Sequence, residues 1–181
     1  GNDYINENRV THADSTLFNV FTLPAITGYT KIALNEPNTV VITESAAKKY
    51  FGSINEALGK NVETNENGST LYKVTAVIKD IPRNSHFNFD FFFSMDNVEY
   101  GFGNFLSNNF HTYVVLKPGT DYKAFNKNFR QVIEKYVVPQ ASQFMEVKSM
   151  EDFEKAGNKL EYSLIPITDI HLRSSRQVEL G

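Results

Sequence analysis

The chain has no cysteine, no signal peptide and no long apolar run among its 181 residues. The absence of cysteine excludes a disulfide framework and a thiolate metal site. No apolar stretch approaches the roughly 20 residues that cross a bilayer, so no membrane span is predicted within this sequence. Since the chain begins with Gly1 and not with Met, we expect further segments on either side of it in the intact protein.

An excess of positive charge is also lacking. The formal net charge is -3, which gives no electrostatic reason to expect nucleic acid or an anionic lipid surface as a partner. The sequence is 41% hydrophobic and 22% charged, as is usual for a folded domain, and 15 Phe and 9 Tyr supply material for a sizeable core. The composition therefore predicts a globular domain.

The stretch from Thr39 to Pro82 shows the clearest succession of structural patterns. Its β-branched opening, Thr39–Thr43, predicts a buried strand. Thr43 is a suitable N-cap for the helix that follows, and Gly52 is a suitable C-terminal stop. Within this helix apolar residues are four apart, which predicts one apolar face.

A β-hairpin is predicted next. Asn61–Thr64 and Leu71–Ile78 are separated by a segment that contains Asn67-Gly68, a strong two-residue turn pattern. The return strand is expected to place alternate residues from Tyr72 to Ile78 on one face.

Three further strands and two further helices are predicted. The strands are Arg9–Ala13, Phe110–Leu116 and Leu160–Ile165, and the helices are Tyr122–Tyr136, ending before Pro139, and Met150–Ala156, capped by Ser149. The polar residues 2–8 predict a loose segment. Strands mixed with helices in this order predict an α+β fold.

A longer strand, Phe87–Met95, follows the hairpin. Alternation places Phe87, Phe89, Phe91, Phe93 and Met95 on one face, with Phe92 as an exception. An aromatic face of this size has to be covered, and we expect helices to cover it.

Three strings in this region carry a resemblance: VVITESAAKKYFG, ALGK and YKVTAVIKDIPRNSHFNFDF. They resemble the periplasmic core domain of MacB-like ABC transporter permeases, and more narrowly the FtsX/MacB-type permeases of Bacteroides-like bacteria. The matching positions are Ala46, Ala47, Tyr50, Phe51, Gly52, Gly59, Lys60, Val74, Val77, Asp80, Pro82, Asn84, Ser85 and His86. The upstream run Ala13–Phe21 and the late run Pro166–Leu172 fit as well, so the resemblance spans nearly the whole chain.

The resemblance implies a porter-like α/β subdomain that is split in sequence, residues 2–27 and 86–172. A mostly β, Sabre-like subdomain would be inserted at residues 28–85, and residues 173–181 would lead toward a membrane helix. In the family an additional strand usually precedes the region around Ala13, so we expect one edge of the porter sheet to be unpaired. Five family-motif positions are expected to matter structurally: Tyr50 and Phe51 as packing anchors, and Gly52, Gly59 and Pro82 for backbone geometry.

Catalytic, cofactor and metal residues are not predicted. The sequence has no Gly-x-Ser-x-Gly elbow, Walker motif or Gly-x-Gly-x-x-Gly, and its four histidines are scattered. Strand alternation would place Asp169 and His171 on one side, as a base and its orienting partner would require. We favour a packing or surface role for His171.

The leading interpretation is therefore a non-enzymatic periplasmic domain of an inner-membrane permease in a Gram-negative bacterium. By resemblance its partners would be the permease's own membrane helices, a cytoplasmic ATPase, a second permease copy and a periplasmic cargo or partner protein, and it would couple ATP hydrolysis to periplasmic movement in mechanotransmission or efflux. Two alternatives stay open. A free periplasmic binding module predicts a secretion signal upstream and no membrane helix downstream. A hydrolase predicts a third polar group beside Asp169 and His171.

Overall fold

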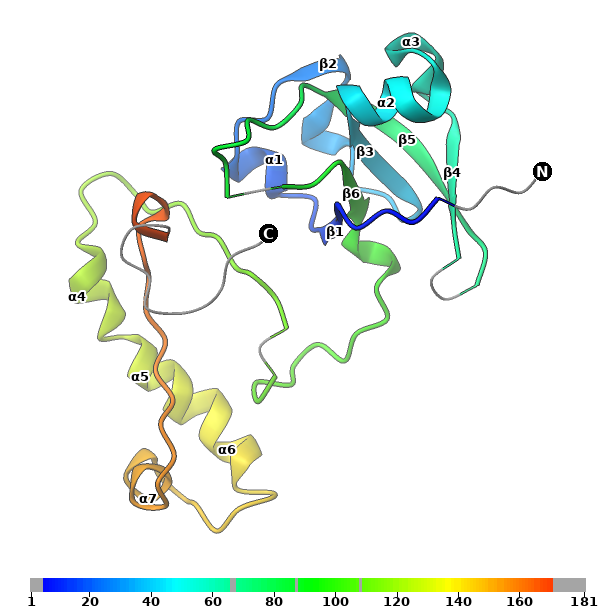
Figure 1. Ribbon diagram of the computed structural model, residues 1–181. Helices are drawn as coiled ribbons and strands as arrows, with labels where there is room; N and C mark the ends of the chain where they lie inside the picture. Colours follow the sequence, from blue (N-terminus) through cyan, green and yellow to red (C-terminus); the bar gives the residue numbers. More distant parts are fainter. Residues whose placement is uncertain (1–4, 66–67, 87, 108, 171–181) are drawn as a thin grey trace. The chain divides into compact units, whose positions relative to one another are not determined.

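The computed structural model describes residues 5–65, 68–86, 88–107 and 109–170. Two compact units divide the chain (Figure 1). The first contains the described residues up to Glu99, and the second contains those from Tyr100 onward. The predicted α+β class is confirmed, since strands and helices are both present.

Within its described residues, the first unit is built on a mixed six-stranded sheet with the order β1-β6-β3-β5-β2, and β4 also pairs with β5. The strands are β1 (Val10–Ala13), β2 (Ala25–Gly28), β3 (Thr39–Thr43), β4 (Asn61–Thr64), β5 (Thr70–Ile78) and β6 (Phe91–Ser94). The β1–β6 and β3–β5 pairs are parallel, and the other pairs are antiparallel. Because β3 lies between β6 and β5, the predicted buried strand is the centre of the sheet.

Helix α2 (Glu44–Phe51) and the short helix α3 (Ile54–Ala57) cover one face of this sheet. All five residues of β3 are buried, and the core cluster beneath the helices includes Val40, Ile42 and Phe91. Burying a side chain of this size contributes about 1.5–3 kcal/mol. The remaining short elements of this unit are α1 (Leu17–Val20), η1 (Thr30–Ile32) and η2 (Met95–Asn97).

Strand β6 is shorter than the sequence predicted. It begins at Phe91 and ends at Ser94, Met95 starts the 3-10 turn η2, and Phe87 lies outside the described residues. Phe91 and Phe93 pack under the helices as expected, whereas Phe89 contacts Phe92, whose ring also meets Phe18 on the opposite face. The alternation fails before Phe91 because those residues have left the strand.

The hairpin of β4 and β5 forms as predicted, with Thr64 opposite Thr70. Asn67, one half of the predicted turn, lies outside the described residues. The predicted single face of β5 is wrong beyond Val74, because Val77 and not Ala76 joins Tyr72 and Val74 in the helix-covered cluster. A β-bulge explains this, since Val40 pairs with Val74 while Val41 pairs with Ala76, leaving one extra residue on β5.

The six-stranded sheet contains strands from both of the predicted subdomains. Strands β3, β4 and β5 come from the predicted insertion, and they share one sheet with β1, β2 and β6 from the flanking segments. The assignment of these segments to porter-like and Sabre-like subdomains stays a prediction.

The second unit contains a long helical segment, as predicted, made of α4 (Tyr122–Asn126), α5 (Phe129–Val132), the π-turn η3 (Ile133–Val137) and α6 (Val138–Ala141). Asp121 caps its start by accepting from two backbone N–H groups. The expected end before Pro139 is wrong, since the helix continues through this residue. Val138 N–H donates to the Ile133 carbonyl, five residues back. Pro139 is the second residue of α6, in its first turn, where no N–H donor is needed.

Helix α7 (Met150–Lys155) is confirmed, with the Ser149 hydroxyl accepting from Asp152 N–H. The predicted strands Phe110–Leu116 and Leu160–Ile165 are wrong, since these described residues form no strand. Strand-like patterning needs a neighbouring strand to pair with, and the described residues of this unit supply none. A 3-10 turn, η4 (Ile167–Asp169), follows.

Two glycines with a similar positive φ are expected to differ in their tolerance of alanine. Gly28 has φ +82, and a Cβ there would lie 2.4 Å from the Thr75 carbonyl oxygen, whereas Gly52 has φ +79 and nothing within 4 Å. Gly52→Ala should therefore cost only the left-handed backbone, about 1–2 kcal/mol. Gly28→Ala should cost clearly more, because β2 must move away from β5. Urea unfolding followed by circular dichroism measures both free energies, and equal losses would contradict the close approach.

Candidate functional site

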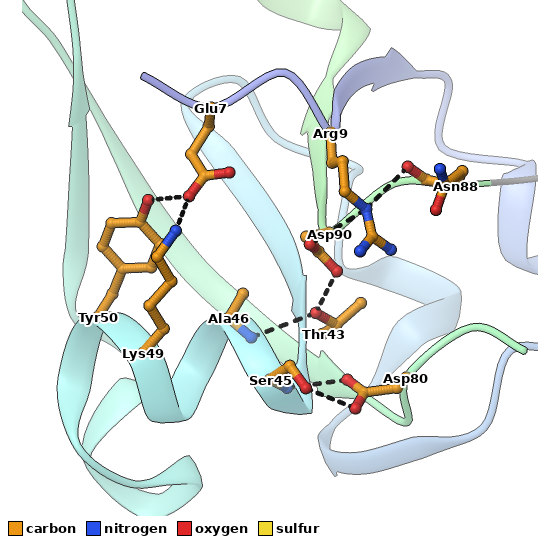
Figure 2. A network of polar contacts seen from close by, with 10 residues as sticks. All are labelled: Glu7, Arg9, Thr43, Ser45, Ala46, Lys49, Tyr50, Asp80, Asn88 and Asp90. Atoms are coloured by element: carbon orange, nitrogen blue, oxygen red, sulfur yellow. Dashed lines mark hydrogen bonds and ion pairs between the residues drawn. The ribbon is translucent and has the colours of Figure 1, made fainter. Parts of the chain in front are cut away.

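The N-terminal strap, defined here as residues 5–13, meets α2 and β6 in a network of polar contacts (Figure 2). The strap enters the fold beside the C-terminal turn of α2 and continues as β1 along β6. Two of its side chains, Glu7 and Arg9, bind groups that lie far away in sequence. The network joins the start of the described chain to the centre of the first unit.

Glu7 binds the end of α2. Its carboxylate accepts hydrogen bonds from Lys49 Nζ and from the Tyr50 hydroxyl. The Tyr50 ring packs edge-on against Phe91, with ring centroids 5.5 Å apart, and this holds the hydroxyl in place. The hydrogen bonds from Lys49 and Tyr50 lower the pKa of Glu7 below its ordinary 4.5, while burial and the bond to Glu7 raise the pKa of Tyr50.

Arg9 binds the segment that leads into β6. Its Nε lies 3.3 Å from Asp90 Oδ2 and donates to the Asn88 carbonyl at 3.2 Å. The backbone adds to this attachment, because the Arg9 carbonyl accepts from Asp90 N–H at 2.7 Å and from Phe91 N–H at 3.2 Å. Side chain and backbone thus fix the strap at one point.

Asp90 links this point to the beginning of α2. The Thr43 hydroxyl, which is completely buried, donates to Asp90 Oδ1 at 2.9 Å and accepts from Ala46 N–H at 3.3 Å. Thr43 N–H donates in turn to the Asp90 carbonyl at 3.0 Å. The predicted helix cap is confirmed, and it is also the inner end of a chain of contacts from Arg9 through Asp90 to α2 (Figure 2).

A second carboxylate holds the same helix end. Asp80, just after β5, accepts from Ser45 N–H at 2.8 Å and from the Ser45 hydroxyl at 2.6 Å. A carboxylate in this position also compensates the positive end of the helix dipole. The start of α2 is therefore bound to the ends of β3 and β5 and to the entry of β6.

The five predicted motif positions fall in three places. Tyr50, Phe51 and Gly52 lie together at the end of α2, where both aromatic rings pack on the core and Gly52 N–H donates to the Lys48 carbonyl. Gly59 N–H donates to the Val74 carbonyl at 2.8 Å, and the exposed Pro82 begins a turn by accepting from Ser85 N–H at 2.9 Å. The structure brings the first three together, and the structural importance of all five stays a prediction.

Sequence reasoning missed the strap contacts. Glu7 lies in a polar segment that was expected to be loose, and its partner Lys49 is 42 residues away. Thr43 was indicated as a helix cap, and Tyr50 and Asp80 as positions that carry the family resemblance, but their partners in this network were not. No local pattern connects Arg9 with Asp90, so only the fold reveals that pair.

The network shows little that could carry out chemistry. Its carboxylates are engaged by the donors described above, and within the described ranges no three His, Cys, Asp or Glu side chains are grouped closely enough to hold a metal ion. Asp169 lies in the turn η4 and not in a strand, and His171 is outside the described residues, so the strand argument for that pair does not apply. In the part of the chain that the structure describes, no helix has the length and hydropathy of a membrane span.

Comparison with known proteins relates the chain to a family and to a solved structure. The model of the MacB-like periplasmic core domain matches residues 1–132. A solved domain of a protein assigned as a permease, from Porphyromonas gingivalis, is 25% identical and superposes with a TM-score of 0.63 over 87% of this chain. This chain spans 62% of that one. No curated protein matches the chain.

The Glu7 attachment generates a pH prediction. Because the pKa of Glu7 is lowered in the folded state, its contribution to stability is present above pH 4.5 and is lost as the pH falls through the lower folded value. Glu7→Gln should reduce the free energy of unfolding at pH 7 by about 1–2 kcal/mol, and by much less at pH 3. Glu134→Gln, which removes the exposed pair with Arg130 and lies outside this network, is the matched control and should have little effect. A Glu7→Gln loss that does not change with pH would contradict this role.

Thr43 offers a test of the inner link. Thr43→Val keeps the shape but removes the hydroxyl that binds Asp90 and caps α2, so we expect a loss of about 2–3 kcal/mol. Thr43→Ser retains the hydroxyl and should lose less. Thermal and urea unfolding measure both, and a valine variant as stable as the serine variant would show that the hydroxyl contributes nothing.

Proposed function

The chain belongs to the family of MacB-like periplasmic core domains, and from this premise we propose that it passes movement between the membrane part of an ABC transporter permease and the periplasm. The family places the chain as a permease domain on the periplasmic side of a membrane. The proposal goes further in assigning it a mechanical role, in which ATP hydrolysis by a cytoplasmic partner displaces this domain.

The proposed setting is the inner membrane of a Gram-negative bacterium. The permease's own helices would flank the domain, an ATPase would bind on the cytoplasmic side, and a second permease copy would complete the transporter. The cargo or partner in the periplasm would be a peptide, a lipoprotein, a small antibiotic or an activator of cell-wall hydrolysis. None of these roles requires a catalytic group in this domain.

The observation that carries the mechanical proposal is the attachment of the N-terminal strap. A loose leader would absorb a displacement of the chain that precedes it, whereas this strap is bound through Glu7 to α2 and through Arg9 to β6. Packed elements move as units, because a close-packed core resists gradual deformation. A pull on the strap therefore acts on α2 and the central sheet together.

The test is a distance measurement in the full-length permease with its ATPase partner in lipid vesicles. This chain has no cysteine, so Glu63→Cys on the exposed side of β4 gives one labelling site in it, and a second is placed at the cytoplasmic end of a membrane helix. Double electron–electron resonance should show different distance distributions with ADP-vanadate and without nucleotide.

The control uses an ATPase partner that cannot bind ATP, with which the two distributions should be the same. Identical distributions with the active ATPase, in a preparation that hydrolyses ATP, would overturn the mechanical role. Family membership would not be affected by that result.

A further inference from the structure

We propose that the N-terminal strap is a releasable element, which detaches from β6 and α2 as one unit while the rest of the first unit stays folded. This release is a property of the domain itself and does not depend on the proposed function. Its use as a limit on transmitted movement does rest on that function.

The strap has little apolar burial. Among the described residues, its strand β1 pairs over four residues with β6 alone, at the outer position of the sheet path. Ala13 is the buried hydrophobic residue of β1, and Val10 is 37% exposed. The central strand β3, in contrast, has neighbours on both sides and is wholly buried. Since burial of apolar area is the main stabilising contribution in a sheet of this kind, β1 is the more weakly held strand.

Polar contacts make up much of the attachment, and one side chain of each ion pair is exposed to solvent. The Lys49 side chain is 53% exposed and the Arg9 side chain is 43% exposed. Charges of this kind regain water when they separate, so breaking the pairs costs far less than breaking a buried pair. Glu7 and Arg9 are two positions apart on the strap, and further along β1 the ring of His12 adds a contact with Phe93, with ring centroids 5.6 Å apart.

The structure behind the strap is complete without it. The Thr43 hydroxyl keeps both of its partners, Asp90 and Ala46, because neither belongs to the strap. Strand β6 keeps its antiparallel pairing with β3, and α2 keeps its cover over the core cluster. Release therefore removes one strand from the sheet and does not open the core beneath α2, which is the condition for a separate opening step.

Two backbone amides distinguish this local opening from global unfolding. Asp90 N–H donates to the Arg9 carbonyl and loses its partner when the strap leaves. Thr43 N–H donates to the Asp90 carbonyl and keeps its partner. Hydrogen exchange of the complete 181-residue chain, followed by NMR, should show faster exchange at Asp90 than at Thr43.

Substitutions that weaken the attachment and an engineered disulfide, called a staple here, are expected to change the opening in opposite directions. The double variant Glu7→Gln, Arg9→Gln should accelerate Asp90 exchange by about tenfold or more relative to Thr43. Ala13→Cys with Ser94→Cys joins residues that are paired in the β1–β6 register, and the oxidised form should slow Asp90 exchange to the rate of Thr43. Glu63→Cys with Leu71→Cys staples the opposite region of the sheet and should leave the ratio of the two rates unchanged. The reduced form of each staple controls for the substitutions themselves.

Equal exchange at Asp90 and Thr43 in the unmodified chain would overturn the proposal, and so would a double variant that accelerates both amides equally. An Ala13–Ser94 staple that forms but leaves Asp90 exchange unchanged would overturn it as well. The distance measurement in the full-length permease is a separate readout. A releasable strap without nucleotide-dependent movement refutes the proposed function alone, and movement with uniform exchange refutes the strap alone.

Discussion

The complete burial of β3 is the constraint on which the rest of the first unit depends. All five of its residues are buried, and two of them, Thr39 and Thr43, are polar. A buried hydroxyl without a partner costs about 1–3 kcal/mol, so each threonine must find one inside the fold. Thr39 donates to the Glu36 carbonyl, and Thr43 donates to Asp90. Asp90 is thereby held where it can receive Arg9, so the surface attachment of the strap follows from a requirement of the core.

The two units differ in how completely they bury their own apolar side chains. The first buries its large residues around β3, whereas the second has a small cluster centred on Ile133, Val137 and Met150. Several of its large apolar residues are strongly exposed, among them Val115 at 72% and Phe144 at 79%. The π-turn before Pro139 changes the hydrogen-bonding pattern of the long helix, and the helix then continues through this proline.

Features that depend on near neighbours were predictable from the sequence. Strand β3, the Thr43 cap, the Gly52 stop and the Ser149 cap are determined by residues within about four positions, and the structure confirms each of them. The strap contacts were not predictable, because Arg9 and the Asn88 carbonyl are 79 residues apart. Hydrophobic pattern also misplaced two strands of the second unit, since alternation records which side chains avoid water and does not record whether a pairing strand exists.

Strand β5 has a consequence for how the sequence of this domain can change in length. One edge of β5 carries β3, and the other carries β4 along Thr70–Lys73 and β2 along Ala76–Ile78, with the bulge residue Thr75 between them. Thr75 donates to the carbonyls of Ala33 and Val40, which fixes the extra residue in place. An insertion or deletion on one side of Thr75 would invert the faces of that half only. The register therefore constrains the number of residues within each half of β5, whereas the loops outside the paired strands are not subject to this constraint.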